Sequence, residues 1–376
     1  MFDVLLSLSI SFVITFLAIP VIIRVAESKK LFDVPDKRKI HKAHIPSLGG
    51  LGIFAGFLVT CLLCIQLSNA PEFQYYFAAA LIMFFFGLKD DILVISPLKK
   101  FLGQAIAAFL LIYKGGLQIS SMQGFLGVFE MPQMFSLFLT YFTVLVVINS
   151  FNLIDGVDGL AGTLGVIASS LFGFYFLKAD IIPYAVLGFA LAGSLAAFLI
   201  FNYYPAKIFM GDTGSMLIGL VNAVLVVKFI TVAQQPGISP HIDASPAIGF
   251  TILLIPLLDT LRVFGIRIFN QRSPFSPDRN HIHHLMLRKG WSHNTITGML
   301  ATSSITFVVA AYLLRELGCT WLVSCGIVVF FAGIAVLYFS RRSRLFVSHH
   351  PLSTRKTPVT RIIPLTKEVV LEQHNL

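Results

Sequence analysis

The stretch "FSLFLTYFTVLVVINSFNLIDGVDGLAG", residues 135–162, joins an uncharged apolar run to a pair of carboxylates. Residues 135–148 carry no charge, and Asp155 and Asp158 follow three residues apart among glycines and small apolar side chains. The run predicts a membrane-spanning helix, and acids at membrane depth are costly and usually functional. We therefore expect functional chemistry at the end of this helix.

The composition extends this interpretation to the whole chain. The sequence is 56% hydrophobic and only 12% charged, which is about half the charged fraction of a globular protein. Apolar runs near the roughly 20 residues needed to cross a bilayer recur along it. The first run, residues 4–23, lacks a basic n-region and a small-x-small cleavage site, so we interpret it as a retained helix. The expected fold is an all-α polytopic membrane bundle.

We expect about eleven membrane spans within an integral membrane domain, residues 1–340, followed by a polar and flexible cytoplasmic tail, residues 341–376. The expected spans are 4–23, 49–67, 74–88, 101–114, 136–150, 160–177, 183–201, 213–232, 247–268, 297–314 and 320–340.

Basic residues set the expected orientation, because cytoplasmic loops are enriched in Lys and Arg. With the N-terminus outside, the loop 24–45 is inside and holds seven basic residues, whereas the outside loops hold Lys114, Lys178 and Arg315. The C-terminus is then cytoplasmic. The net charge of +10 is explained by loops that face anionic lipid rather than by nucleic-acid binding. No basic segment interleaves aromatics as a single-strand binder would.

Five polar segments fall on the expected cytoplasmic side, and we expect them to form one composite site there. They are "KRKIHKAHIPSLGG" (37–50), "GLKDDIL" (87–93), "NSFNLIDGVDGLAG" (149–162), "FNYYPAKIFMGDTGS" (201–215) and "NQRSPFSPDRNHIHHLMLRKG" (270–290).

The acids of these segments predict a divalent-metal site. Five of the 18 acids in the chain stand at helix ends, and hard oxygen ligands of this kind are what Mg²⁺ requires, with Mn²⁺ as a substitute. Asp212 stands in a Gly-Asp-Thr-Gly turn just before a span, where it is interpreted as a ligand, or as an ordinary helix N-cap. The five acids are Asp90, Asp91, Asp155, Asp158 and Asp212.

The histidines His281, His283 and His284 form an H-x-H-H run with Arg279 just before it. A zinc site lacks a matching fourth ligand nearby, and a solvated loop with chance histidines is a second interpretation. We favour a third, contact with a phosphorylated and sugar-bearing ligand, because His and Arg donate well to such groups. Cys61 and Cys64 form a C-x-x-C in an apolar span, and there we interpret them as two small apolar residues rather than as a redox or metal site.

Together the motifs resemble the polyprenyl-phosphate N-acetylhexosamine-1-phosphate transferase family, which includes the phospho-N-acetylmuramoyl-pentapeptide transferase of peptidoglycan synthesis. The similarity covers about residues 37–290 and rests on "HKAHIPSLGG", "KDDILVISPLKKFLGQ", "NSFNLIDGVDGLAG", "FNYYPAKIFMGDTGS" and "SPDRNHIHH", in that order. It implies transfer of a sugar-1-phosphate from a UDP-N-acetylhexosamine to undecaprenyl phosphate, with release of UMP, at the cytoplasmic face of a bacterial inner membrane.

Within that family, "DRNHIHH" is similar to the UDP-N-acetylglucosamine branch, which starts O-antigen, common-antigen or teichoic-acid-type glycans. The muramoyl-pentapeptide branch has three consecutive histidines, whereas Ile282 precedes His283 and His284 here. A UDP-N-acetylmuramoyl-pentapeptide or another UDP-N-acetylhexosamine remains the alternative donor, and the sequence leaves a homodimer open.

The resemblance also implies residue roles. Asp212 corresponds to the magnesium ligand, and the acids Asp90, Asp91, Asp155 and Asp158 correspond to catalytic positions. In one place the chain departs from the family, because the motif usually written Asp-Asp-x-x-Asp has Val94 at its fifth position. The positions that correspond to substrate-binding residues are Lys42, Lys100, Asn152, Asn202, Arg279, His281, His283 and His284.

For the mechanism we favour direct attack of the acceptor phosphate on the donor. A phosphate monoester has a second pKa near ~6 and is mostly dianionic at neutral pH, so a base has little to do. An aspartyl-phosphate intermediate is the rival. A cation-coupled transporter is the other class to weigh, but transporters carry their coupling acids near the midplane and often show internal repeats. The chain shows no such repeat.

Overall fold

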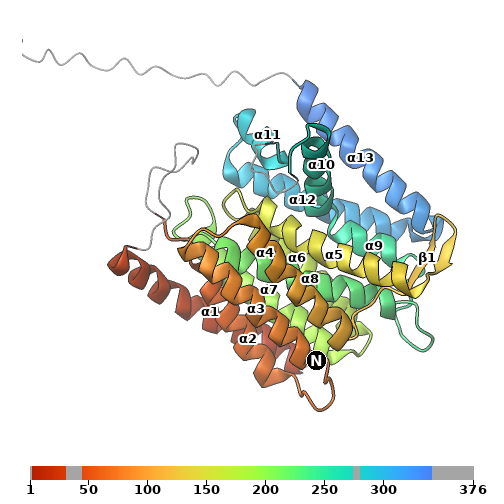
Figure 1. The fold of residues 1–376 in the computed structure, drawn as a ribbon, viewed down its shortest axis with the longest axis horizontal. Coiled ribbons are helices and arrows are strands. Elements are labelled where there is room, and N and C mark those ends of the chain that lie inside the picture. The colour runs from red at the N-terminus through yellow and green to blue at the C-terminus, as the bar shows by residue number, and fades with distance from the viewer. Residues whose placement is uncertain (1, 31–44, 274–279, 341–376) are drawn as a thin grey trace, which may run out of the picture. The chain divides into compact units, whose positions relative to one another are not determined.

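The computed structural model describes residues 2–30, 45–273 and 280–340, and these are mostly helical (Figure 1). The helices are α1 (Phe2–Lys29), α2 (Gly49–Cys64), α3 (Phe73–Ile92), α4 (Pro97–Phe109), α5 (Gln133–Ile154), α6 (Leu160–Lys178), α7 (Ile182–Asn202), α8 (Gly211–Val232), α9 (Ser245–Ile252), α10 (Leu254–Phe269), α11 (Ile282–Arg288), α12 (His293–Leu313) and α13 (Cys319–Phe339). A π-helical turn (Leu110–Lys114) follows α4, and a 3₁₀ turn (Arg315–Leu317) precedes α13. Strands β1 (Ser121–Phe125) and β2 (Val128–Glu130) form an antiparallel hairpin.

The helices confirm a multi-pass membrane protein of the all-α class. Among the described residues, seven helices are long and apolar enough to cross a membrane: α1, α5, α6, α7, α8, α12 and α13. The pair α9 and α10, bent by 78°, would make an eighth span. Each expected segment coincides with a helix or a helical pair, but α2, α3 and α4 do not meet the same test, so the count of eleven stays a prediction. The expected tail, 341–376, lies outside the described residues.

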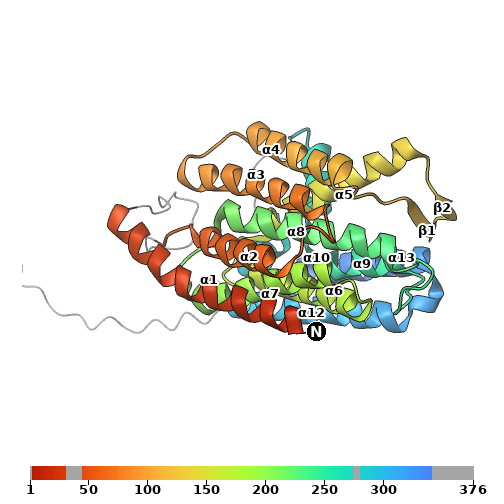
Figure 2. The ribbon, with the colours of Figure 1, turned by 90° about the horizontal axis from the view of Figure 1, so that it is seen from below.

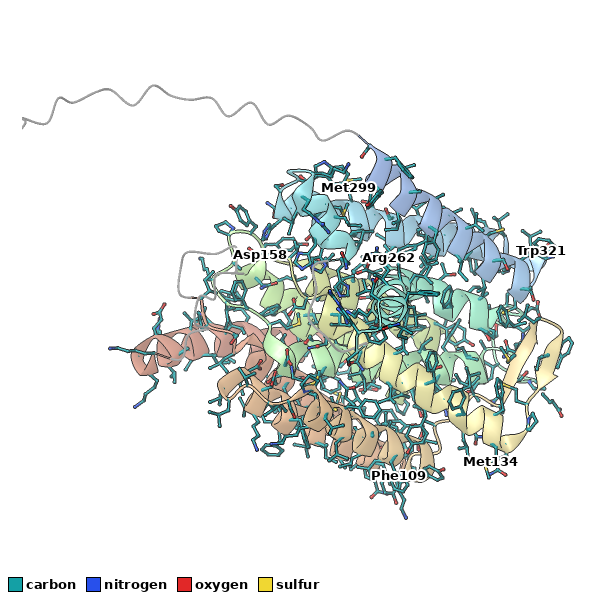
Figure 3. The ribbon with its side chains drawn as sticks, turned by 45° about the horizontal axis from the view of Figure 1, so that its top comes forward. Phe109, Met134, Asp158, Arg262, Met299 and Trp321 are labelled. Carbon is teal, nitrogen blue, oxygen red and sulfur yellow. The ribbon has the colours of Figure 1, made fainter. Side chains whose placement is uncertain are left out.

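Large apolar side chains lie on the outside of the bundle. Leu17 is 63% exposed, Val336 is 68% exposed and Phe339 is 81% exposed. Figure 3 shows Phe109, Met134 and Trp321 at the edges of its view, whereas Asp158 and Arg262 lie inside. An apolar surface of this extent is unfavourable in water and is matched by the hydrocarbon of a bilayer.

Helix α8 is the centre of the bundle, and 89% of its most apolar 18-residue stretch is buried. It contacts α2, α3, α5, α6 and α7. In Figure 2 it lies between the layer of α3 and α4 and the helices α6 and α7. Because α8 begins at Gly211, its first turn brings Asp212 to the point where these neighbours end or begin.

A glycine allows α3 to lie directly against that first turn. A Cβ on Gly87 would stand 2.5 Å from the Cα of Thr213 and 2.7 Å from its backbone nitrogen. Only a residue without a side chain permits this approach, since both atoms belong to backbone. The acids that follow in α3, Asp90 and Asp91, are thereby carried to the start of α8.

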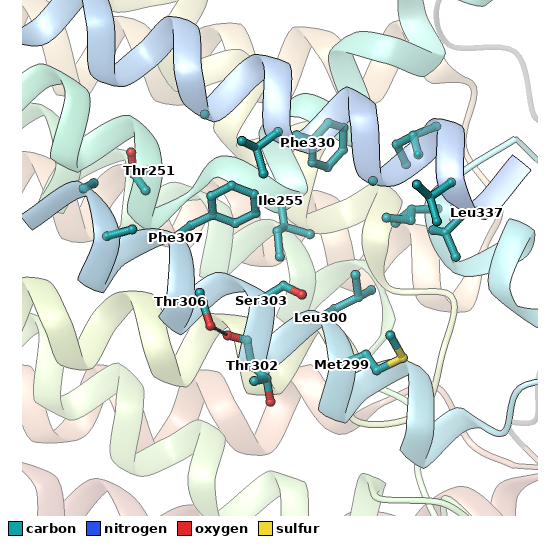
Figure 4. A pocket seen from close by; sticks show the side chains of 18 of the residues that line it. Thr251, Ile255, Met299, Leu300, Thr302, Ser303, Thr306, Phe307, Phe330 and Leu337 are labelled. Carbon is teal, nitrogen blue, oxygen red and sulfur yellow. Dashed lines mark hydrogen bonds between the residues drawn. The ribbon is translucent and has the colours of Figure 1, made fainter. Parts of the chain in front are cut away.

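An apolar cavity of about 930 Å³ lies among α9, α10, α11, α12 and α13 (Figure 4). Ile255, Phe307 and Phe330 line it, and none of its lining residues is charged. Such walls suit hydrocarbon and offer no counter-charge to a phosphate, so the polar chemistry of the chain has to be sought at the helix ends.

Candidate active site

Asp91 caps the first turn of α8 from the neighbouring helix α3. Its Oδ1 accepts the backbone N–H of Asp212 at 2.6 Å, and its Oδ2 accepts the N–H and the hydroxyl of Thr213 at 3.1 and 2.6 Å. Residue Met210, which precedes α8, makes no side-chain cap. The exposed amides of a helix start need acceptors, and a carboxylate there is favoured by the helix dipole. Both oxygens of Asp91 are therefore engaged in holding α3 against α8.

Lys100 joins two carboxylates. Its ammonium group forms ion pairs with Oδ2 of Asp90 and with Oδ2 of Asp212. The other oxygen of Asp90 accepts the N–H of Ile95 at 2.8 Å, which fixes the orientation of that carboxylate. Two acids that would otherwise repel each other thus converge on one cation, where α3, α4 and α8 meet.

Asn152 completes the surroundings of Asp212. Its Nδ2 lies 3.0 Å from Oδ1 of Asp212 and 3.0 Å from Oγ of Ser215. The last turns of α5 are held in place by a reciprocal pair of side-chain amides, since Nδ2 of Asn149 donates to Oε1 of Gln104 at 2.7 Å. The expected grouping of Asp90, Lys100, Asn152 and Asp212 is therefore present in the structure.

The donor set of this cluster fits a magnesium ion that is shared with a substrate. Among the described residues, no three His, Cys, Asp or Glu side chains form a ready-made metal site. Mg²⁺, however, is usually held by one or two carboxylates, with substrate phosphates and water completing its shell. Asp90 and Asp212 are two carboxylates whose oxygens already converge on a positive charge, that of Lys100.

Asp155 follows the last residue of α5 and belongs to the same electrostatic cluster. Burial raises the pKa of its carboxyl to about 7, and the negative charges of Asp212, Asp91 and Asp158 add to the shift. A group of acids held this close favours a bound cation, which would relieve their mutual repulsion.

Asp158 and Asn202 hold backbone segments together. Oδ2 of Asp158 accepts the N–H of Ala206 at 3.2 Å, and Oδ1 lies 3.3 Å from Nδ1 of His293 in α12. Oδ1 of Asn202 accepts the N–H of Gly159 at 2.9 Å, and Nδ2 donates to a carbonyl. These contacts support anchoring roles, while the catalytic role of Asp158 and the substrate-binding role of Asn202 stay predictions.

The histidine run packs against the acidic turn. The rings of His281 and His283 are parallel with centroids 5.7 Å apart, and His284 follows at 4.3 Å from His283. A Cβ on Gly156 would stand 2.4 Å from Nε2 of His283, so this glycine lets the ring lie beside Asp155. Burial and the charge of His284 lower the pKa of His283 to about 3, which keeps its ring neutral.

Two expected binding residues, Lys42 and Arg279, lie outside the described residues. Val94, at the place of the third acid of the family motif, is 96% exposed. Two residues at the site were not expected from the sequence: Asp259, which bonds to His281, and His293, which bonds to Asp158. The sequence contained a feature that could have singled out Asp259, because this residue is an acid inside the mainly apolar run 251–266. His293 had no such feature, since a lone histidine at a helix start is unremarkable.

Comparison with known proteins identifies the family of the chain. Residues 73–230, which contain Asp90, Asp91, Asp155, Asp158 and Asp212, match the model of glycosyl transferase family 4. The chain is 36% identical over 312 residues to an undecaprenyl-phosphate alpha-N-acetylglucosaminyl 1-phosphate transferase of Pasteurella multocida, covering 81% of this chain and 84% of the relative.

Two further relatives come from other bacteria. A probable undecaprenyl-phosphate N-acetylglucosaminyl 1-phosphate transferase of Bacillus subtilis is 29% identical, with 82% of this chain and 85% of the relative covered. A decaprenyl-phosphate N-acetylglucosaminephosphotransferase of Mycobacterium leprae is 30% identical, with 76% and 77% covered. On this family match and the identity to the Pasteurella multocida relative over most of both chains, this chain is a transferase and belongs to glycosyl transferase family 4.

Proposed function

We propose that this protein transfers N-acetylglucosamine-1-phosphate from UDP-N-acetylglucosamine to undecaprenyl phosphate, releasing UMP and forming the lipid-diphosphate sugar that begins a cell-envelope glycan. The names of the relatives support the sugar and the polyprenyl acceptor. The observation that carries the proposal is the convergence of Asp90 and Asp212 on Lys100, because a diphosphate and a phosphate need such an arrangement of charges to meet.

The proposed location is the inner membrane of a bacterium, with the site facing the cytoplasm. The UDP-sugar is soluble and the acceptor is anchored in lipid, so the reaction has to occur where a bilayer meets water. The acidic cluster lies at the ends of α3, α5 and α7 and at the starts of α4, α6 and α8, as this requires. The basic loops expected on that side support the same orientation.

We propose Mg²⁺ as the metal, with Mn²⁺ as a substitute, held by Asp212 and Asp90. When bound, the ion would neutralise charge on the oxygens of the diphosphate. Lys100 would then be free to turn from the two carboxylates towards a phosphate, because a lysine is a flexible point charge. Asn152 keeps Oδ1 of Asp212 oriented throughout.

The bond changes follow from direct attack. An oxygen of the acceptor phosphate bonds to the β-phosphorus of the donor, and the bond from that phosphorus to the bridging oxygen breaks, so UMP leaves with the bridging oxygen. The acceptor is already mostly dianionic at neutral pH, and no proton has to be removed. Asp91 is a poor nucleophile here, since both of its oxygens accept hydrogen bonds from α8.

The test is an assay of the purified full chain in lipid nanodiscs with UDP-N-acetylglucosamine, undecaprenyl phosphate and Mg²⁺. We expect UMP and a lipid-linked N-acetylglucosamine-1-phosphate in equal amounts, and no product after EDTA. UDP-N-acetylmuramoyl-pentapeptide and UDP-N-acetylgalactosamine serve as competing donors. If no UDP-N-acetylhexosamine gave acceptor-dependent UMP, the proposal would be overturned.

A single-turnover experiment separates the two mechanisms. With donor and Mg²⁺ but without acceptor, direct attack predicts no early UMP, whereas an aspartyl-phosphate intermediate predicts up to one UMP for each enzyme molecule. Adding undecaprenyl phosphate should start UMP release at once. A burst of UMP before that addition would exclude direct attack.

A further inference from the structure

The buried carboxylate of Asp259, in α10, organises the start of the histidine run. Its Oδ1 accepts Nη2–H of Arg262 at 2.8 Å and the backbone N–H of Ile282 at 2.9 Å, and its Oδ2 lies 2.8 Å from Nδ1 of His281. The Asp259 side chain is 1% exposed and that of His281 is 5% exposed. Three donors thus share two oxygens in a site that water does not reach.

The geometry of this cluster decides which ring nitrogen of His281 carries a proton. A carboxylate has no proton to donate, so the Nδ1 atom that faces Oδ2 of Asp259 at 2.8 Å is the one that donates. The stacked neighbour, His283, is neutral, because burial and His284 lower its pKa to about 3. A neutral ring that faces a carboxylate oxygen through Nδ1 carries its proton there, which leaves a lone pair on Nε2.

The Nε2 atom of His281 is buried and has no hydrogen-bond partner in the part of the chain that the structure describes. A buried acceptor without a partner is unfavourable, and such an atom calls for an explanation. The run lies beside the acidic turn, since His283 contacts Gly156 next to Asp155. The ring of His281 is stacked on that of His283 with centroids 5.7 Å apart, so it lies one ring beyond this turn.

We propose that Asp259 is a positioning residue that holds His281 as its Nδ1–H tautomer and so presents Nε2 as an acceptor for a hydroxyl or N–H group of the donor sugar. The lone pair on Nε2 repels phosphate oxygens, so His281 contacts the sugar and not the diphosphate. The diphosphate is bound by cations instead. The identity of the sugar rests on the proposed function, whereas the tautomer does not.

The first experiment measures the tautomer directly in the full chain. Histidine labelled with ¹⁵N in the ring is incorporated, and the signals of His281 are identified by their loss in His281→Gln. At pH 8 we expect a proton on Nδ1 and none on Nε2. A proton on Nε2 would overturn the proposal, and the result does not depend on whether the proposed reaction occurs.

The second experiment reverses the tautomer with Asp259→Asn. The amide oxygen keeps Arg262 and Ile282, so the amide N–H₂ turns to His281 and moves the ring proton to Nε2. We expect KM for UDP-N-acetylglucosamine to rise about tenfold, the value of one hydrogen bond, while inhibition by UDP changes less than about twofold. An equal loss of UDP binding would overturn the proposal, because UDP has no sugar.

A double variant distinguishes positioning from a merely structural role. His281→Gln keeps an acceptor near Nε2 but has no Nδ1, so adding Asp259→Asn to it should raise KM no further. Additive effects would show that Asp259 acts elsewhere. If Asp259→Asn does not fold because Arg262 loses its counter-charge, Asp259→Asn with Arg262→Gln removes both charges, and the same split between UDP-sugar and UDP is expected.

The chain offers a matched control in a second Asp–His pair. Oδ1 of Asp243 lies 3.0 Å from Nε2 of His241 in the connection before α9, but there the Asp243 side chain is 87% exposed. Asp243→Asn removes the same carboxylate without burial and should change neither KM nor inhibition by UDP. A change equal to that of Asp259→Asn would contradict a specific role for the buried pair.

Discussion

Asp90 and Asp91 are adjacent in the chain and have different tasks. Consecutive residues of a helix point about 100° apart, so one acid faces α8 and the other faces Lys100. Asp91 accepts hydrogen bonds from the first turn of α8, while Asp90 pairs with the lysine. The repulsion of two neighbouring acids is relieved because each has its own donors.

Asp212→Asn tests the centre of the acidic cluster. The change keeps the volume and removes the charge that faces Lys100, so turnover should fall by about 10² or more while the melting temperature stays nearly the same. UMP release and thermal unfolding measure the two effects. Ser215→Ala removes one hydrogen bond of Asn152 without removing a charge, and it should cost far less activity. Full activity of Asp212→Asn would show that the charge lies elsewhere.

Asp155→Asn tests the raised pKa at the end of α5. A carboxyl with a pKa of about 7 in the folded state stays protonated while the unfolded chain ionises near about pH 4. The favourable contribution of Asp155 is therefore present below about pH 4 and is lost as the pH rises to about 7. In EDTA, the variant should gain stability over the wild type as the pH rises across this range. A constant difference across the range would contradict the shift.

Among the helices, the contact between α3 and α8 sets the position of Asp91 at the start of α8. Gly87→Ala would place a methyl group 2.5 Å from the backbone of Thr213, so the two helices have to separate. We expect a loss of roughly 1–3 kcal/mol in the free energy of unfolding, and a loss of turnover because Asp91 moves from the α8 amides. Chemical denaturation and the UMP assay measure both.

Gly265→Ala in α10 is the matched control for this change. A Cβ there meets no atom within 4 Å, so the substitution should be neutral or slightly stabilising, as expected when Ala replaces Gly in a helix. Equal losses in the two variants would show that the close approach of α3 and α8 does not matter.

The long helices were predictable from the sequence, whereas the bend between α9 and α10 and the short elements were not. The apolar runs predicted the long helices, because a membrane-spanning segment has few alternatives. The expected span 247–268 is instead two helices bent by 78° around Leu253. Pro256 was the available signal, since a proline suits the first turn of a helix and disturbs its interior. The hairpin of β1 and β2 and the short α11 had no comparable signal in hydropathy.

At the site, the grouping of Asp90, Lys100, Asn152 and Asp212 was predictable from the sequence, because the order and spacing of the motifs that contain them resemble those of a known family. Motifs do not show which acid bonds to which donor. That choice depends on tertiary approach, as when Gly87 lets Asp91 reach the α8 amides. The pairing of Asp259 with His281 joins residues 22 apart across a helix break, and only the fold reveals it.

On the scale of the whole molecule, the acidic cluster and the connection 233–244 are expected on opposite sides of the membrane. In a background without native cysteines, Gly237→Cys should react with an impermeant maleimide in intact cells. Arg272→Cys should react only after permeabilisation. Both positions are exposed in the structure, so access depends on the membrane alone. The reverse pattern would invert the topology and place the site outside.

The link between Asp158 and His293 has a consequence for biosynthesis. The two residues are 135 positions apart, and α12 follows every other helix that contributes to the acidic cluster. On the ribosome, all five acids are therefore made and inserted before Asp158 meets its histidine. A chain that ends before α12 therefore lacks the contacts of His293 and Thr297 with Asp158, and the turn at residues 155–159 is without this support until α12 has been made.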